Sequence, residues 1–406
     1  MEKVKIGLLK ETKTPPDWRA ALTPTTAKEL LELYPNAQVC IQPSDIRAFK
    51  DEEYIAAGLP LKEDLTDCDI LLGVKEVKIE TLIPEKTYMF FAHVAKKQDH
   101  NKPLLKALME KKITLIDYEY LTRPNGVRMV AFGYWAGVVG AYNGLRAWGK
   151  KYNEFDLPPA HTFGSQQKMY EYIKENIKLT RPFKIVITGG GRVARGATDT
   201  LNAFGIKEVI PEDFLIENFD YPVFTRLDPC HYVRHKQGKE FELKYFFQHP
   251  EEFESTFRPY TWIADMYIAA HYWDPRAPKF FTAEDTRHPR FNIKVVADIS
   301  CDVDNGPVGT TLRASTIADP FYDFNPQTGK EEPPFSRPEN ITVMAVDNLP
   351  GELARDSSEA FSAVLVENVF PYLLGEDTDG VIERATILKN GQLTDRFKYL
   401  EDWVNS

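Results

Sequence analysis

The chain has 406 residues, of which 43% are hydrophobic and 27% are charged, and its formal net charge is −10. This length allows two domains of ordinary size, and the apolar content excludes a disordered or fibrous protein. The negative charge argues against a nucleic-acid partner or an anionic membrane surface.

The cysteines and the N-terminus bear on the compartment. Four widely spaced cysteines do not form a disulfide framework and fit a reducing environment. The first residues lack the apolar core of a signal peptide, and the most apolar stretch, residues 129–142, is too short to span a bilayer. We therefore expect a cytoplasmic protein without a membrane partner.

Short apolar runs alternate with amphipathic stretches in the first part of the chain. The expected buried strands are Val4–Leu9, Ala37–Gln42, Asp69–Val74, Tyr88–Ala92 and Ile113–Asp117. Between them, Thr26–Leu33 and Pro103–Lys112 have the apolar spacing of helices. This alternation predicts a parallel sheet covered on both sides.

A second unit begins near Tyr134. The expected elements are a strand at Lys184–Thr188, a helix from Arg192 to Phe204, a strand at Lys294–Ile299 and a last helix at Ser357–Phe370. Residues 221–285 are rich in aromatic side chains and are expected to form an insertion, either with its own small core or as an oligomer contact. Residues 321–340 hold four prolines and are expected to form a surface loop.

A triple glycine lies between the strand Lys184–Thr188 and the helix that follows. The segment fits strand, G-x-G-x-x-A, helix, with Gly189 for the tight turn, Gly191 for close approach of a pyrophosphate and Ala194 for close helix packing. Helix N-terminal amides would face the anion. The segment predicts a dinucleotide site formed by Gly189, Gly190, Gly191, Arg192, Val193 and Ala194.

The acidic residue that usually binds the ribose is not evident. It is expected about 20 positions after the turn, near Val209, where several acids occur and none is clearly placed. Arg192 and Arg195 could approach a 2′-phosphate or could be solvated helix residues. The choice between NAD and NADP therefore stays open.

A lysine and a histidine each directly follow an expected strand. Lys75 comes after Asp69–Val74, and His93 comes after Tyr88–Ala92. Parallel strands emerge on one edge, where ligands bind, so the two side chains are expected to share a rim. A lysine of lowered pKa and a histidine are suited to proton transfer near pH 7, although each could also be an ordinary surface residue.

Further charged residues could reach the same rim. They are Arg19, Lys96, Arg128 and Glu119. Several cations on one edge of an acidic protein suit a substrate with several carboxylates.

Motifs along nearly the whole chain resemble the alanine dehydrogenase/saccharopine dehydrogenase superfamily. Those of the superfamily are Lys10-Glu11-Thr12, Arg19-Ala20-Ala21-Leu22-Thr23-Pro24, Gly73-Val74-Lys75-Glu76, Phe91-Ala92-His93 and the segment Val346–Leu353. Leu115–Glu119, Gly126–Gly133, Arg258–Thr261, His271–Trp273 and Asn390–Tyr399 are similar to one branch. That branch holds the lysine–ketoglutarate reductase half of aminoadipic semialdehyde synthase and, more distantly, lysine-forming saccharopine dehydrogenase.

The resemblance implies an α/β fold of two Rossmann-like doubly wound domains with an active-site cleft between them. Residues 1–133 plus 353–406 would form the substrate domain, similar to the alanine dehydrogenase N-terminal domain. Residues 134–352 would form the dinucleotide-binding domain, with the insertion at about 221–285.

The resemblance also implies an NAD(P)-dependent oxidoreductase that interconverts saccharopine with lysine plus 2-oxoglutarate through an imine and hydride transfer. Lys75 and His93 would do the acid–base work, and Arg19 would hold a substrate carboxylate. Glu76, Lys96, Gln98 and Glu119 would line the site or tune the two bases. Asp302, Asp347 and Leu349 would lie near the cofactor.

Three alternatives accompany this hypothesis. The chain could act on a smaller amino acid, as alanine dehydrogenase does, or bind a dinucleotide without catalysis. Cys230, His231 and His235 have a spacing that can serve a metal on a helix, but no second ligand cluster accompanies them, so we expect no metal site. A homo-oligomer remains open.

Overall fold

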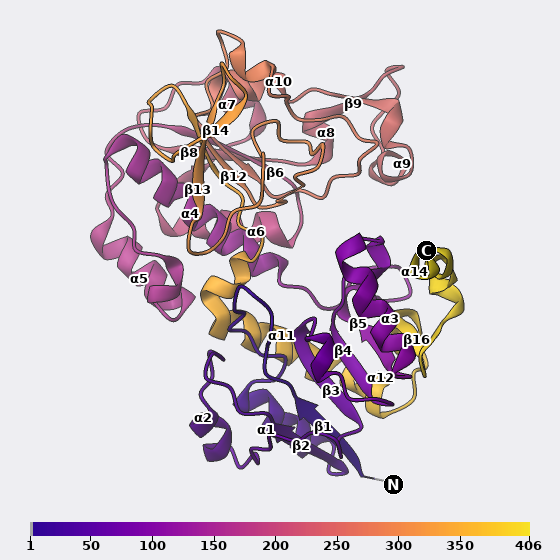
Figure 1. Cartoon of the computed structure of the whole chain (residues 1–406). Helices are drawn as coiled ribbons and strands as arrows, with labels where there is room; N and C mark the ends of the chain where they lie inside the picture. The colour runs from indigo at the N-terminus through magenta and orange to yellow at the C-terminus, as the bar shows by residue number, and fades with distance from the viewer. Residues whose placement is uncertain (1–2) are drawn as a thin grey trace. The chain divides into compact units, whose positions relative to one another are not determined.

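A computed structural model describes residues 3–406, which fold into two compact units (Figure 1). The first unit runs to Phe132 and resumes at Ala354, and the second is Gly133–Leu353. Each unit contains one large, mostly parallel sheet with helices between its strands. The protein is therefore of the α/β class, as the alternation of strands and helices predicted.

The sheet of the first unit has seven strands in the order β17-β16-β5-β4-β3-β1-β2. Five of them run parallel: β1 (Val4–Leu8), β2 (Ala37–Ile41), β3 (Ile70–Lys75), β4 (Thr87–Phe91) and β5 (Thr114–Asp117). The other two, β16 (Thr386–Lys389) and β17 (Gln392–Leu393), come from the end of the chain and pair antiparallel. The five strands expected from the sequence in this unit are thus confirmed.

The helices of the first unit come from both of its chain segments. They are α1 (Pro24–Leu33), α2 (Asp51–Ala56), α3 (Lys102–Glu110), α11 (Ala354–Asn368), α12 (Phe370–Leu374), α13 (Val381–Ala385) and α14 (Glu401–Asn405). Short 3-10 helices lie at Ile79–Thr81, Val94–Lys96, Asp99–Asn101, Tyr118–Tyr120 and Asp395–Leu400.

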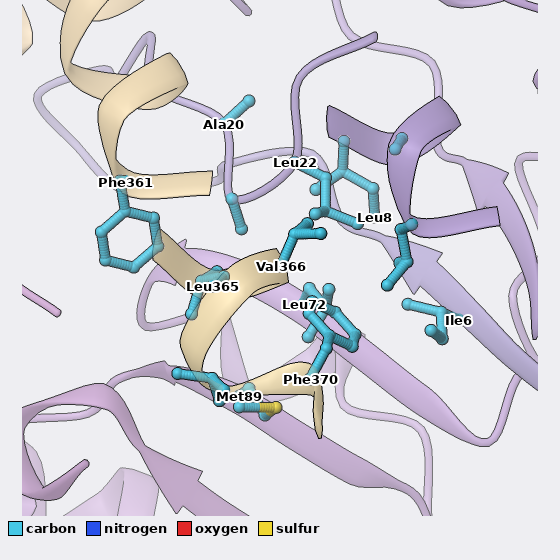
Figure 2. Close-up of a cluster of buried hydrophobic side chains, with 14 of the residues drawn as sticks. Ile6, Leu8, Ala20, Leu22, Leu72, Met89, Phe361, Leu365, Val366 and Phe370 are labelled. Atoms are coloured by element: carbon cyan, nitrogen blue, oxygen red, sulfur yellow. The ribbon is translucent and has the colours of Figure 1, made fainter. Parts of the chain in front are cut away.

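The returning helix α11 joins the core of the first unit. Figure 2 shows side chains of α11 and α12 gathered with side chains of the sheet strands, and the labelled residues are Ile6, Leu8, Ala20, Leu22, Leu72, Met89, Phe361, Leu365, Val366 and Phe370. All of them are buried. Because α11 supplies part of this core, the end of the chain is an integral part of the first unit.

The sheet of the second unit has eight strands in the order β14-β13-β15-β12-β11-β6-β8-β7. The parallel strands are β6 (Lys184–Thr188), β7 (Lys207–Glu208), β8 (Val223–Leu227), β11 (Met266–Ala269), β12 (Val295–Asp298) and β15 (Ile341–Met344). At one edge, β13 (Phe321–Asn325) and β14 (Lys330–Glu332) pair antiparallel. A separate two-stranded ladder joins β9 (Val233–His235) and β10 (Phe253–Ser255).

The helices of the second unit are α4 (Gly133–Tyr152), α5 (Gln166–Asn176), α6 (Arg192–Ala203), α7 (Pro211–Ile216), α8 (Pro229–Tyr232), α9 (Leu243–Gln248) and α10 (Arg258–Ile263). Short 3-10 helices lie at Ala160–Thr162, Pro250–Glu252, Asp285–Arg287 and Leu349–Leu353. Two glycines let α4 and α6 touch: a Cβ on Gly137 would lie 1.9 Å from the carbonyl oxygen of Val193, and one on Gly196 would lie 2.0 Å from that of Tyr134. This contact fixes the helix that follows the glycine turn.

Two sequence expectations in the second unit need correction. The range 221–285 contains β8 and β11, which are strands of the main sheet. The segment that stands outside that sheet is residues 229–255, called here the aromatic segment. Residues 321–340 are not a surface loop, because β13 is a fully buried strand, and the prolines lie beside the strands rather than in them.

None of the helices formed by residues 3–406 has the length and apolarity that a membrane crossing requires.

Candidate active site

Lys75 and His93 lie at the carboxyl ends of two adjacent strands of the first unit. Lys75 is the last residue of β3 and pairs in the ladder with Phe91, the last residue of β4. His93 follows two positions later, with a left-handed backbone (φ 55°) that is uncommon for a residue other than glycine. The prediction that the two residues come from one edge of a parallel sheet is confirmed.

Two partly or fully buried carboxylates fix these strand ends. Glu11 accepts hydrogen bonds from the amides of Val74 (2.6 Å) and Lys75 (3.0 Å). Asp117 accepts them from the amides of Ala92 (3.2 Å) and Glu119 (2.8 Å). Burial raises the pKa of each of the two carboxyls to about 7. Sequence reasoning gave neither residue a role, although Glu11 stands in one of the motifs.

The Lys75 ammonium is disfavoured by its surroundings. Burial, together with the positive charges of Arg19 and Lys13, lowers the pKa of Lys75 from 10.5 to about 8. The Nζ atom forms no ion pair within 4 Å among residues 3–406, and the more distant carboxylates of Asp17 and Glu76 only partly offset the lowering of its pKa. Lys75 can therefore gain and lose a proton close to neutral pH.

Glu76 links His93 to Lys13. One of its oxygens lies 2.7 Å from the Lys13 Nζ, and the other lies 3.7 Å from the His93 Nδ1. Burial alone would raise the pKa of Glu76, but the contacts with His93 and Lys13 outweigh it and hold that pKa at about 2. Glu76 is therefore ionised at neutral pH and lies beside the histidine ring, which is also stacked on Phe91. Lys13 is a site residue that sequence reasoning missed.

Arg19 is buried and engaged inside the unit. It is 3% exposed, donates two side-chain hydrogen bonds to Asp17 (2.9 and 2.6 Å), and stacks on the Phe132 ring at 4.3 Å. Burial would raise the pKa of Asp17, but the Arg19 guanidinium outweighs this and lowers it below the usual range. A substrate carboxylate could reach Arg19 directly only if the Arg19–Asp17 pair opened.

The other predicted substrate residues form a second charged group. Glu119 lies 3.0 Å from the Lys96 Nζ and 3.9 Å from the Arg128 guanidinium. Burial raises the pKa of Glu119, but Lys96, Arg128 and His93 together lower it. His93 thus acts on the pKa of Glu119 and also contacts Glu76, so it lies near both charged groups. Gln98 accepts a hydrogen bond from Asn101, whose amide also donates to the carbonyl of His93.

The glycine turn of the second unit fits a dinucleotide. Gly189 has φ 118°, and a Cβ there would lie 2.4 Å from the carbonyl oxygen of Ala270. A Cβ at Gly191 would meet no atom within 4 Å, so the space above the first turn of α6 is open. An anion could approach the helix amides through this space.

A pocket of about 780 Å³ lies beside this turn. Gly189, Gly190, Gly191, Arg192 and Val193 contribute to its wall, and Ala194 is buried beneath them. The other three residues predicted near the cofactor do not line it. Asp302 and Asp347 follow the neighbouring strands β12 and β15, and Leu349 is buried in the core.

An acid that the sequence analysis did not single out, Asp228, lies beside the glycine turn. The strand next to β6 is β8, not the two-residue edge strand β7 near Val209, and Asp228 directly follows β8. Its Oδ1 would lie 2.3 Å from a Cβ on Gly190, so the carboxylate reaches the glycine turn. Arg226 donates to it over 2.7 Å. The segment Val223–Leu227, which precedes Asp228, could have been predicted as a strand. Because α7 comes before it, Asp228 lies further along the sequence than the usual spacing from the glycine turn.

The histidines considered for a metal have other partners. His235 Nε2 lies 3.0 Å from Glu252, and the His231 Nδ1 accepts from the Asp228 amide. Among residues 3–406, no group of three or more His, Cys, Asp or Glu side chains is arranged to hold a metal ion.

Comparison with known proteins agrees with this architecture. Residues 7–139 match the alanine dehydrogenase/PNT N-terminal domain. Two solved structures share the fold: an L-alanine dehydrogenase (TM-score 0.67, 18% identity, 99% of this chain and 100% of that one) and a transhydrogenase from Sinorhizobium meliloti (TM-score 0.58, 14% identity, 96% and 98%).

Sequence relatives cover most of the chain. The mitochondrial alpha-aminoadipic semialdehyde synthase of Bos taurus is 31% identical over 94% of this chain, and a saccharopine dehydrogenase [NAD(+), L-lysine-forming] of Yarrowia lipolytica is 28% identical over 95%. The chain spans 46% of the former protein and 96% of the latter. It thus covers about half the length of the mammalian synthases.

Fold and site together define an α/β protein with two mostly parallel sheets, one with Lys75 and His93 at the ends of adjacent strands and the other with a glycine turn before α6. Through residues 7–139 the chain belongs to the alanine dehydrogenase/PNT N-terminal domain family, and over most of its length it is similar to alpha-aminoadipic semialdehyde synthases and lysine-forming saccharopine dehydrogenases.

The Arg19–Asp17 pair gives a test of the site's internal electrostatics. Arg19→Leu leaves a buried Asp17 carboxylate without its partner, which we expect to lower the free energy of unfolding by about 3–5 kcal/mol at pH 7. The loss should shrink toward pH 4, because the pKa of Asp17 rises when the Arg19 guanidinium is removed and the carboxylate can then be protonated. Urea unfolding at both pH values measures this.

The double variant Asp17→Asn/Arg19→Leu is the matched control. It should recover part of the stability at pH 7, since no uncompensated charge remains. An Arg19→Leu variant as stable as the wild type at pH 7 would contradict the assignment of a buried ion pair.

Proposed function

We propose that the chain is an NAD-dependent oxidoreductase that interconverts saccharopine with lysine plus 2-oxoglutarate. The reaction class is supported by the relatives that match most of the chain. They are alpha-aminoadipic semialdehyde synthases and proteins named as lysine-forming saccharopine dehydrogenases. The chain also supplies two side chains suited to the proton transfers of this reaction, Lys75 and His93.

The observation that carries the proposal is the pairing of Lys75 with His93 at adjacent strand ends. Amine addition to a ketone, loss of water and the reverse steps each need a proton to be moved near neutral pH. Lys75, with a pKa of about 8, is partly deprotonated at pH 7–8 and can accept such a proton. His93, which lies beside the ionised Glu76, is the second group able to donate or accept one.

The charges around the pair fit a substrate that carries several carboxylates. Four cations of this unit each contact a carboxylate: Lys13 contacts Glu76, Arg19 contacts Asp17, and Lys96 and Arg128 contact Glu119. Lys96 (53% exposed) and Arg128 (39% exposed) are the more accessible, so we propose them as the residues that contact substrate carboxylates. Arg19 then acts mainly through its field on Lys75.

The dinucleotide site favours NAD. When bound there, the nicotinamide ring would supply or accept the hydride. We propose that Asp228, at the end of β8 and ion-paired with Arg226, accepts from the ribose hydroxyls. Gly189 and Gly191 leave the backbone open to the pyrophosphate.

A substrate screen tests the proposal. The wild-type protein is assayed with NAD(H) and NADP(H) in both directions, using lysine plus 2-oxoglutarate, saccharopine, and alanine or pyruvate. Turnover of the first two substrate sets supports the proposal. Turnover restricted to alanine and pyruvate would replace it with an alanine dehydrogenase-like activity, and dinucleotide binding without any turnover would indicate a non-catalytic protein.

Lys75→Met should lower turnover by about 10²- to 10⁴-fold, because it removes a positioned acid–base group. The affinity for NAD should stay unchanged, since Lys75 lies in a different unit from the glycine turn. Steady-state kinetics and calorimetric titration with NAD measure the two quantities. Lys78→Met, which changes an exposed lysine three positions on, is the control and should keep full turnover. Undiminished turnover of Lys75→Met would remove the catalytic assignment.

Asp228→Ala should shift the cofactor preference toward NADP. Loss of a charge-assisted hydrogen bond to the ribose should raise KM for NAD by about 10- to 100-fold, while KM for NADP stays constant or falls. Asp220→Ala removes an exposed acid elsewhere in the same unit and should leave the NAD/NADP ratio of kcat/KM as it is. An Asp228→Ala protein with the wild-type ratio would show that another residue reads the ribose.

A further inference from the structure

The backbone that carries His93 has an uncommon conformation. His93 (φ 55°) and Lys97 (φ 56°) are both left-handed, and a single turn of 3-10 helix, Val94–Lys96, lies between them. This conformation is unfavourable for residues other than glycine, so it persists only where contacts from the rest of the fold hold it. The segment His93–Lys97, called here the His93 turn, bears two residues of the proposed site, His93 and Lys96.

The His93 turn shares an apolar cluster with residues 395–405. Val94 and Ala95 are buried, and they belong to the same cluster as Phe397, Leu400 and Val404. Residues 395–405 form the 3-10 helix Asp395–Leu400 and α14, and α14 packs beside α3, the helix that follows the turn (Figure 1).

Tyr399 contacts the His93 turn directly. Its hydroxyl donates to the carbonyl oxygen of Ala95 over 2.9 Å, and the Lys97 Nζ lies 5.3 Å from the centre of its ring. One side chain thus holds the middle of the turn by a hydrogen bond and its end by a cation–π contact. Because Tyr399 is 50% exposed, its replacement removes these contacts without emptying the core.

The same segment also contacts the carboxylate side of the neighbouring ion pair. The Phe397 ring meets Tyr120 edge to face, with the ring centroids 5.0 Å apart. Tyr120 directly follows Glu119, whose carboxylate lies 3.0 Å from the Lys96 Nζ. Phe397 and Tyr399 therefore contact the two short chain segments that bear Glu119 and Lys96.

Two hydrogen bonds hold the 3-10 helix that follows the turn, Asp99–Asn101. Trp403 Nε1 donates to the Asp99 carboxylate over 3.2 Å, and the Asn101 side-chain amide donates to the carbonyl of His93 over 3.2 Å. Residues 395–405 thus contact the chain within the His93 turn and directly after it.

We propose that Tyr399 is a positioning residue, which holds the His93 turn so that His93 stays in place for proton transfer and Lys96 for contact with a substrate carboxylate. The inference rests on the proposed function of these two residues and deepens it. It also gives a role to the Asn390–Tyr399 motif, which no step of the proposed reaction uses.

Tyr399→Phe removes the hydroxyl and keeps the ring. The turn then loses one hydrogen bond, so kcat with saccharopine and NAD should fall by about 3- to 10-fold and KM for saccharopine should rise. KM for NAD should stay unchanged, because the glycine turn belongs to the other unit. Tyr399→Leu also removes the ring from Lys97 and should lower kcat by about 10- to 100-fold. Steady-state kinetics measures these quantities.

Tyr372→Phe is the matched control. Tyr372 lies on α12 of the same unit, and its hydroxyl donates to the Asp379 carboxylate over 2.9 Å. The variant therefore also loses one tyrosine hydrogen bond near the surface, and it should keep the wild-type kcat and both KM values.

Hydrogen–deuterium exchange gives a second measurement, which does not depend on the reaction. In Tyr399→Phe, peptides covering residues 93–102 should exchange faster than in the wild type, while the rest of the first unit exchanges at the wild-type rate. A purely structural role of Tyr399 would instead raise exchange throughout the unit.

The outcomes separate the inference from the proposed function. If the wild type turns over saccharopine, lower kcat with faster exchange confined to residues 93–102 supports the inference, and either change without the other overturns it. Lower kcat with faster exchange across the whole unit also overturns it. A wild type without turnover overturns the proposed function, and the exchange rates then decide the inference alone: a local rise supports the contact, and unchanged rates overturn it.

Discussion

The site depends on a lysine held at a strand end where its charged form is disfavoured. A pKa lowered from 10.5 to about 8 corresponds to roughly 3 kcal/mol against the ammonium of Lys75. Two features maintain this state. Burial, with a smaller contribution from the positive charges of Arg19 and Lys13, disfavours the ammonium, and Glu11 holds the backbone of Lys75 through the amides of Val74 and Lys75. The fold thus tolerates an unfavourable charge at the position where proton transfer is proposed.

The surrounding carboxylates are arranged so that they do not neutralise this lysine. Asp17 is bound by Arg19, Glu76 by Lys13, and Glu119 by Lys96. These three acids are thereby engaged with other cations, Glu11 and Asp117 accept from backbone amides, and Lys75 forms no ion pair within 4 Å among the described residues. Glu76 in addition lies beside His93. This distribution explains why one lysine titrates near neutrality within a group of cations.

Much of the fold could be predicted from the sequence, and the site only in part. The strands of the first sheet and the edge shared by Lys75 and His93 follow from apolar runs and from the geometry of parallel sheets. Lys13, Asp17 and Asp117 were missed, because their roles depend on contacts between separate segments of the chain that no periodicity reveals. Asp228 was missed because β7 and α7 precede its strand, and β13 was hidden by neighbouring prolines. The cleft between the domains and the roles of the site residues stay predictions.

The titration of Lys75 tests this account most directly. The rate at which an amine-specific acylating reagent modifies each lysine, followed by mass spectrometry from pH 6 to 11, gives the midpoint for Lys75 alongside exposed lysines such as Lys78. The account predicts a midpoint near pH 8 for Lys75. A midpoint near 10.5, together with the exposed lysines, would contradict it.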